Sequence, residues 1–239
     1  MSESSPLSTG SSGSPDAVPD SALSLRLASA HLACGDRAGA LAFFREAARG
    51  ESPSWLAALN VGLLELEGGA RAAGIDAFAL AARLAPQEAA PVANLGICYL
   101  LAGQVRDGQE CFEKALARRQ PCPEATSNLG IVYVARGQLV DARRCFEKAA
   151  AQASAEAWAA CNLGAFYALE RQASEAEDCL RAAIGRNESL AAPYRNLAAL
   201  YRERGMEREA VACLNRALRL EPGLEWAIGP WTFAVAMVR

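Results

Sequence analysis

The sequence predicts an all-α solenoid, which is an elongated stack of helical hairpins that share one continuous core. Three observations support this prediction. A 34-residue period runs through the chain without insertion or deletion, each period contains two stretches with helical spacing of apolar residues, and glycine or proline separates the stretches. A hairpin of this size cannot bury its own apolar face, so we expect neighbouring hairpins to stack.

Small and large apolar residues recur at fixed positions of the period. Steps of 34 residues from Ala47 reach alanine every time, and Phe or Leu always lies three residues earlier. The two series are Ala47, Ala81, Ala115, Ala149, Ala183, Ala217 and Phe44, Phe78, Phe112, Phe146, Leu180, Leu214. The residue seven positions before each of these alanines is Ala or Gly. The residue twenty positions before each of them is Leu or Val, and the residue after that one is Gly or Ala. We expect the small residues to let the two helices of a hairpin approach closely, and the large ones to fill the space between hairpins.

The period divides the chain into six repeats of two helices, each about 14 residues long. Glycines should end the first helix of a repeat, at Gly35, Gly103, Gly137 and Gly205. Prolines at 86, 121, 123 and 222 interrupt the chain between repeats. The expected repeats are 21–54, 55–88, 89–122, 123–156, 157–190 and 191–224.

The two ends of the chain differ in composition from the repeats. Residues 1–20 are rich in Ser and Pro and poor in apolar residues, so we expect a disordered tail. Residues 225–239 are apolar and are expected to form a capping segment. One interpretation of this segment is a buried cap over the last hairpin. The other is an exposed surface for self-association or for docking on a partner or a membrane. The candidate residues of that surface are Trp231, Phe233 and Met237.

The repeated residues resemble the tetratricopeptide repeat, whose pattern is Trp–Leu–Gly–Tyr–(Gly/Ala/Ser)–Phe–Ala–Pro. Two matches are Leu95, Gly96, Tyr99, Gly108, Phe112, Ala115 and Leu129, Gly130, Tyr133, Ala142, Phe146, Ala149. The resemblance covers residues 21–224, although the tryptophan position never holds Trp, and His31 and Glu65 stand at the tyrosine position in the first two repeats. It implies a right-handed superhelix with the first helices lining an inner groove, and a role as a protein–protein adaptor, chaperone cofactor or assembly scaffold.

Asparagine precedes the Leu/Val position in five repeats, at Asn60, Asn94, Asn128, Asn162 and Asn196. Asparagine is unfavourable within a helix, so its recurrence needs a reason. A row of side-chain amides could bond a peptide backbone in the groove, as in superhelical repeats with an asparagine ladder. Alternatively, each amide bonds the neighbouring repeat. The other predicted groove residues are Leu59, Leu63, Ile97, Ile131, Trp158 and Arg195.

The composition speaks against several other classes of function. The net charge of −3 offers no basic face for nucleic acid. The eight cysteines include no Cys-x-x-Cys pair, and His31 is the only histidine, so we expect no metal site and no cofactor. We find no catalytic constellation and predict a non-enzymatic protein. No membrane span or secretory signal is evident, which with the unpaired thiols predicts a cytoplasmic location and at most peripheral membrane contact.

The leading functional prediction is therefore an adaptor that binds an extended peptide segment of a client protein in its groove. The alternative is a self-assembling scaffold or complex-assembly factor that uses the apolar C-terminal segment to join copies of the chain. Charged stretches such as YRERGMEREA are expected to form solvated helix surface.

Overall fold

The computed structural model describes residues 21–118, 121–153 and 155–221, and the predictions made for residues 1–20 and 225–239 lie outside this part of the chain. The described residues form twelve helices and no strand. The first helices of the hairpins are α1 (Ser21–Ala33), α3 (Trp55–Glu67), α5 (Ala89–Leu101), α7 (Pro123–Ala135), α9 (Ala157–Leu169) and α11 (Ala191–Glu203). The second helices are α2 (Arg37–Arg49), α4 (Arg71–Leu84), α6 (Val105–Leu116), α8 (Leu139–Gln152), α10 (Ala173–Arg186) and α12 (Glu207–Leu220).

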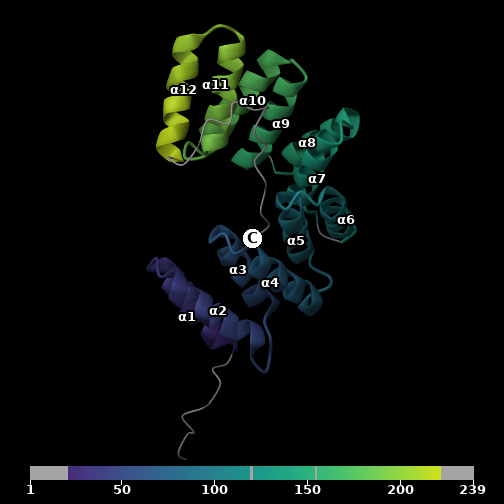
Figure 1. Ribbon diagram of the computed structural model, residues 1–239, viewed down its shortest axis with the longest axis vertical. Coiled ribbons are helices and arrows are strands. Elements are labelled where there is room, and N and C mark those ends of the chain that lie inside the picture. The colour runs from purple at the N-terminus through teal and green to yellow at the C-terminus, as the bar shows by residue number, and fades with distance from the viewer. Residues whose placement is uncertain (1–20, 119–120, 154, 222–239) are drawn as a thin grey trace, which may run out of the picture.

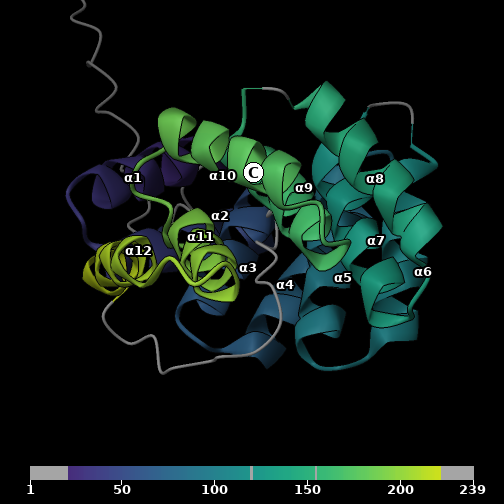
Figure 2. The same cartoon turned by 90° about the horizontal axis from the view of Figure 1, so that it is seen from above.

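The hairpins stack in chain order and bend into a right-handed superhelix, as predicted (Figures 1 and 2). Each second helix packs on the first helix of the next hairpin, and α5 also contacts α7 while α9 contacts α11. The odd-numbered helices line the inner, concave side, and the even-numbered helices face outward (Figures 1 and 2). The first and last hairpins lie at opposite ends of the array in Figure 1.

A glycine packed against an aromatic ring sets the approach of the two helices in three of the six described hairpins. A Cβ atom placed on Gly62 would lie 2.5 Å from the ring of Phe78, and one on Gly130 would lie 2.9 Å from Phe146. Such distances are shorter than a carbon–carbon contact allows, so only glycine permits this packing. The prediction that small residues let the helices approach closely is confirmed at these positions.

The same turn ends the first helix of all six described hairpins. The second residue after each first helix has a left-handed backbone conformation, with φ between 63° and 81°. These residues are Gly35, Gly69, Gly103, Gly137, Arg171 and Gly205. The next residue donates its N–H to the carbonyl five residues back, for example Gln138 to Tyr133 at 2.8 Å. This is the Schellman arrangement, which confirms the predicted role of the glycines. Arg171 is the exception, because a side chain is strained in this conformation.

Replacing Gly130 by Ala should destabilise the array by about 1–3 kcal/mol, because the new methyl group would push into the Phe146 ring. The measurement is urea unfolding followed by circular dichroism. Gly185→Ala is the matched control, since a Cβ there meets nothing within 4 Å in α10. This control should leave stability unchanged or raise it by up to about 1 kcal/mol. Equal effects of the two variants would contradict the packing argument.

Replacing Arg171 by Gly should stabilise the array by about 1 kcal/mol, because glycine adopts the left-handed conformation without strain. The substitution removes an ion pair with Glu203 at 3.1 Å, but both side chains are exposed and such pairs contribute little. The midpoint of thermal unfolding measures the effect, and a lower midpoint would show that the ion pair outweighs the backbone strain.

Candidate functional site

The predicted asparagines lie on the inner helices, and four of them are closed to solvent. We call Asn94, Asn128, Asn162 and Asn196 the carboxamide row; the first three have an exposed fraction of 0% and Asn196 of 2%. Asn60, at the same repeat position in α3, is half-buried, and its Nδ2 donates to the Leu56 carbonyl within its own helix at 2.8 Å.

The described contacts of the carboxamide row join successive hairpins. Asn162 Nδ2 donates to Ser127 Oγ at 2.9 Å, and Asn196 Nδ2 lies 3.8 Å from Cys161 Sγ, a weak acceptor. Every amide of the row is engaged in an interaction. At Asn162 and Asn196 the amide therefore bonds the neighbouring repeat, which was the second of the two interpretations. Peptide binding by the row stays a prediction.

The other predicted groove residues divide into two groups. Leu59 and Ile97 have exposed fractions of 2% and 0% and belong to the packed core, so they offer no surface to a ligand in this structure. Both side chains pack in apolar clusters that residues of successive hairpins form together, which the periodicity of a single sequence does not reveal. The residues that are only half-buried, and so keep accessible surface, are Leu63, Ile131, Trp158 and Arg195.

One exposed apolar residue of α3 and one of α5 belong to the candidate surface. Leu56 in α3 and Leu101 at the end of α5 have exposed fractions of 47% and 46%. Leu101 was not predicted, although it lies one helical turn after Ile97 and shares its helix face. Trp231, Phe233 and Met237 lie outside the described residues.

Comparison with known proteins agrees with this geometry. Residues 192–223, which include the last described hairpin, match the family model for the tetratricopeptide repeat. The five preceding hairpins share the period, turn and helix order of this one. The last described hairpin thus matches the tetratricopeptide repeat, and the described hairpins together have the fold of a solenoid of such repeats. No curated protein sequence matches it significantly.

Solved structures show the same solenoid fold. A chain of the APC/C hetero-tetramer Cut9–Hcn1 has a TM-score of 0.77 at 19% identity, covering 86% of this chain and 41% of that chain. The present chain thus spans about two fifths of that relative's length. PilW, a type IV pilus biogenesis factor, has a TM-score of 0.69 at 21% identity, with coverages of 86% and 95%. PilF of Pseudomonas aeruginosa has a TM-score of 0.66 at 16% identity, with coverages of 85% and 93%.

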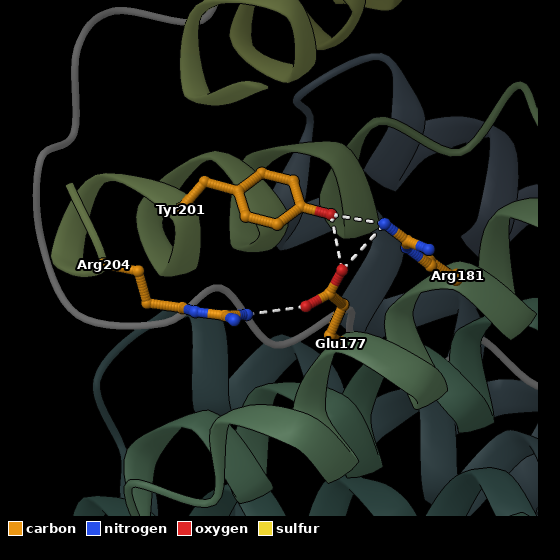
Figure 3. A network of polar contacts seen from close by, with 4 residues as sticks. All are labelled: Glu177, Arg181, Tyr201 and Arg204. Atoms are coloured by element: carbon orange, nitrogen blue, oxygen red, sulfur yellow. Dashed lines mark hydrogen bonds and ion pairs between the residues drawn. The ribbon is translucent and has the colours of Figure 1, made fainter. Parts of the chain in front are cut away.

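A polar network joins the last two described hairpins (Figure 3). Glu177 of α10 accepts hydrogen bonds from the Tyr201 hydroxyl at 2.9 Å and from Arg204 at 2.7 Å. Arg181, one turn along α10, lies 2.8 Å from the Glu177 carboxylate and donates to the Tyr201 oxygen at 3.1 Å. The network satisfies both carboxylate oxygens of Glu177 and links α10 to the end of α11.

Equivalent residues are paired at two earlier junctions between repeats. Gln109 accepts from Arg136, and Arg143 donates to Glu170, in each case 27 residues apart as for Glu177 and Arg204. The first two junctions have Leu41 with Gly68 and Ile75 with Ala102 at these positions, which are apolar pairs. The prediction that YRERGMEREA forms solvated helix surface is confirmed at Arg204, which is exposed and also bonds the preceding hairpin, and is wrong at Tyr201, which is 5% exposed. The recurring 27-residue offset was a signal that sequence analysis could have used.

The network also controls the ionisation of Glu177. Partial burial by itself would raise the pKa of this carboxyl, but hydrogen bonds from Tyr201 and Arg204 and the nearby arginine charges outweigh burial and lower it below the ordinary value of 4.5. Because the pKa is lowered in the folded state, the ionised carboxylate stabilises the array above about pH 4.5, and this contribution is lost as the pH falls through the lowered value.

The described cysteines other than Cys34 are buried or half-buried within the repeats. Cys111, Cys145, Cys179 and Cys213 share one position on the second helices, and all are unpaired. Burial raises the pKa of the Cys145 thiol to about 11, and it raises the pKa of Cys161 to about 12. These thiols are protonated at neutral pH and poorly reactive. Among the described residues, no group of three or more His, Cys, Asp or Glu side chains could hold a metal ion, and no helix is long and apolar enough to cross a membrane.

Replacing Glu177 by Gln should destabilise the array by about 1–2 kcal/mol at pH 7, because the charge-assisted bonds to Tyr201 and Arg204 weaken. The difference from the unsubstituted chain should shrink as the pH falls below 4.5, where the native carboxylate also becomes neutral. Urea unfolding over this pH range measures both effects. Glu188→Gln, at an exposed residue between α10 and α11, is the control and should change neither. A destabilisation of E177Q that does not depend on pH would contradict the assignment.

Proposed function

We propose that this array is a non-catalytic adaptor that holds an extended segment of a client polypeptide along its concave side. The observation that carries the proposal is the accessible surface kept on the inner helices α3, α7, α9 and α11 by Leu56, Leu63, Ile131, Trp158 and Arg195, on the same helices as most of the repeated asparagines. An amide offers one acceptor and two donors, so it can bond a peptide backbone whatever the peptide's side chains are. Superhelical repeat arrays create extended concave surfaces of this kind.

The spacing of the repeats suits a peptide backbone. Packed helices lie about 8–10 Å apart, which equals roughly three residues of extended chain at about 3.3 Å each. One amide per repeat therefore meets the backbone at about every third residue. Because Asn162 and Asn196 also bond the preceding repeat, client binding would require these amides to share or exchange partners.

The half-buried and exposed inner residues indicate the side chains that a client would offer. Leu56, Leu63, Ile131 and Trp158 favour apolar anchors along most of the array. Arg195 and the exposed Arg202 on α11 place positive charge at the end of the row, where a carboxylate of the client would be favoured. The hetero-tetrameric assembly and the pilus biogenesis factor among the similar structures fit an assembly role for such an array.

A non-catalytic role is supported by the packing of the thiols. The described cysteines other than Cys34 are buried or half-buried, and burial raises the pKa of their thiols, which makes them poor nucleophiles. We place the protein in the cytoplasm on the basis of its sequence composition, and this placement stays a prediction.

Affinity capture with the full chain as bait tests the adaptor proposal. The triple variant Asn94→Ala/Asn128→Ala/Asn162→Ala should lose the client that the unsubstituted chain captures, because it removes the polar contacts along the inner helices. Circular dichroism and thermal unfolding must show that the variant keeps its helices. The matched control is Lys148→Ala/Asp178→Ala on the exposed faces of the outer helices α8 and α10, which should capture the same client. Loss of the client from this control, or its retention by the folded triple variant, would move the binding site away from the concave side.

A further inference from the structure

The internal junctions of the array show what each end of it lacks. At every junction a second helix packs on the first helix of the next hairpin, from α2 with α3 to α10 with α11. Among the described helices, α1 has no second helix before it and α12 has no first helix after it (Figure 1). The 34-residue register therefore identifies the side chains of α1 and α12 that would form one more junction.

The open side of α1 is apolar. We call Leu23, Leu27, Ala30 and Cys34 the start face; they follow one side of α1 and its turn, three or four residues apart. Leu23 has an exposed fraction of 48%, and Ala30 and Cys34 are also exposed. In the later hairpins the residues equivalent to Ala30 are half-buried or buried; they are Leu64, Cys98, Val132, Phe166 and Leu200. A preceding hairpin covers this position in each of the later hairpins, and the described residues provide none for α1.

The open side of α12 is apolar as well. We call Val211, Leu214 and Leu218 the end face; they also lie three or four residues apart on one side of their helix. Val211 has an exposed fraction of 53%, whereas Leu214 and Leu218 are half-buried. The residues equivalent to Leu214 in the earlier hairpins are exposed by at most 3%; they are Phe44, Phe78, Phe112, Phe146 and Leu180. Repeat arrays stay soluble when their terminal helices turn polar faces outward, so two apolar ends favour a contact that covers them.

A contact at an internal junction predicts how the two faces would meet. Phe146 packs on Phe166, which follows it by 20 residues, with the ring centroids 5.5 Å apart. Counted from α12 into the first hairpin of a second copy, the same offset places Leu214 on Ala30. Neither side chain carries a charge, so a second copy can cover Leu214 with apolar surface.

The position 27 residues later gives a second pair. At the last internal junction this offset joins Glu177 to Arg204, whereas the first two junctions have apolar pairs there. From Val211 the offset reaches Cys34 of a second copy, and this pair is uncharged. When Val211 and Cys34 meet, no charge is therefore left without a partner, as would happen if either of them faced an arginine or a glutamate.

We propose that the end face of α12 binds the start face of α1 in a second copy of this chain, which joins the copies head to tail. Each chain has one face of each kind, so the contact is heterologous and continues into an open filament or closes into a ring. Burial of apolar surface drives the association. The inference goes beyond the proposed function, because both faces lie at the ends of the array and leave its concave side to a client.

Sedimentation velocity of the full chain at increasing concentration tests the proposal. The unsubstituted chain should form species larger than one chain. Ala30→Glu and Val211→Glu each put a carboxylate into the apolar contact, so each should raise the dissociation constant at least about tenfold. A mixture of the two variants should form a complex of two chains and nothing larger, because A30E keeps its end face and V211E keeps its start face.

Ala38→Glu and Val140→Glu are the matched controls. They occupy one repeat position on the outer helices α2 and α8, are exposed and lie off both faces, so they should associate like the unsubstituted chain. Circular dichroism should show equal helicity for all four variants. An unsubstituted chain that keeps the mass of one chain up to about 1 mM would overturn the proposal. Full assembly of either face variant alone, or a mixture of the two that forms no two-chain complex, would overturn it as well, because the contact would then lie elsewhere in the chain.

Discussion

The close contact between a small residue of one helix and a large ring or aliphatic side chain of its partner is the interaction on which the array depends. Where Gly130 meets Phe146, or Gly62 meets Phe78, there is no room for even one additional carbon. The contact sets how two helices cross, and its repetition every 34 residues makes each hairpin similar to the next. Curvature then follows, because identical units stacked with a constant rotation must form a superhelix.

Two kinds of polar contact distinguish the junctions between these similar units. On the inner side, amides such as that of Asn162 reach back to the previous hairpin. Near the ends of the inner helices, the ion pairs Arg143–Glu170 and Glu177–Arg204 occupy equivalent positions at successive junctions. The earlier hairpin supplies the positive charge in the first pair and the negative charge in the second. A hairpin placed at the wrong junction would bring like charges together, so these pairs favour one order of stacking.

The sequence by itself determined the period, the helix pairs, the glycine turns and the position of the asparagines, because these depend on spacing within one repeat. Two of the turns were not predicted: the one at Gly69, and the one at Arg171, where no glycine marks the turn. Only the tertiary structure decided what lies beside each side chain: that Leu59 and Ile97 are core, that Leu101 is exposed, and that Arg204 bonds Glu177. The burial and the partners of these side chains depend on how whole hairpins stack on one another. The spacing of residues within one repeat does not show this.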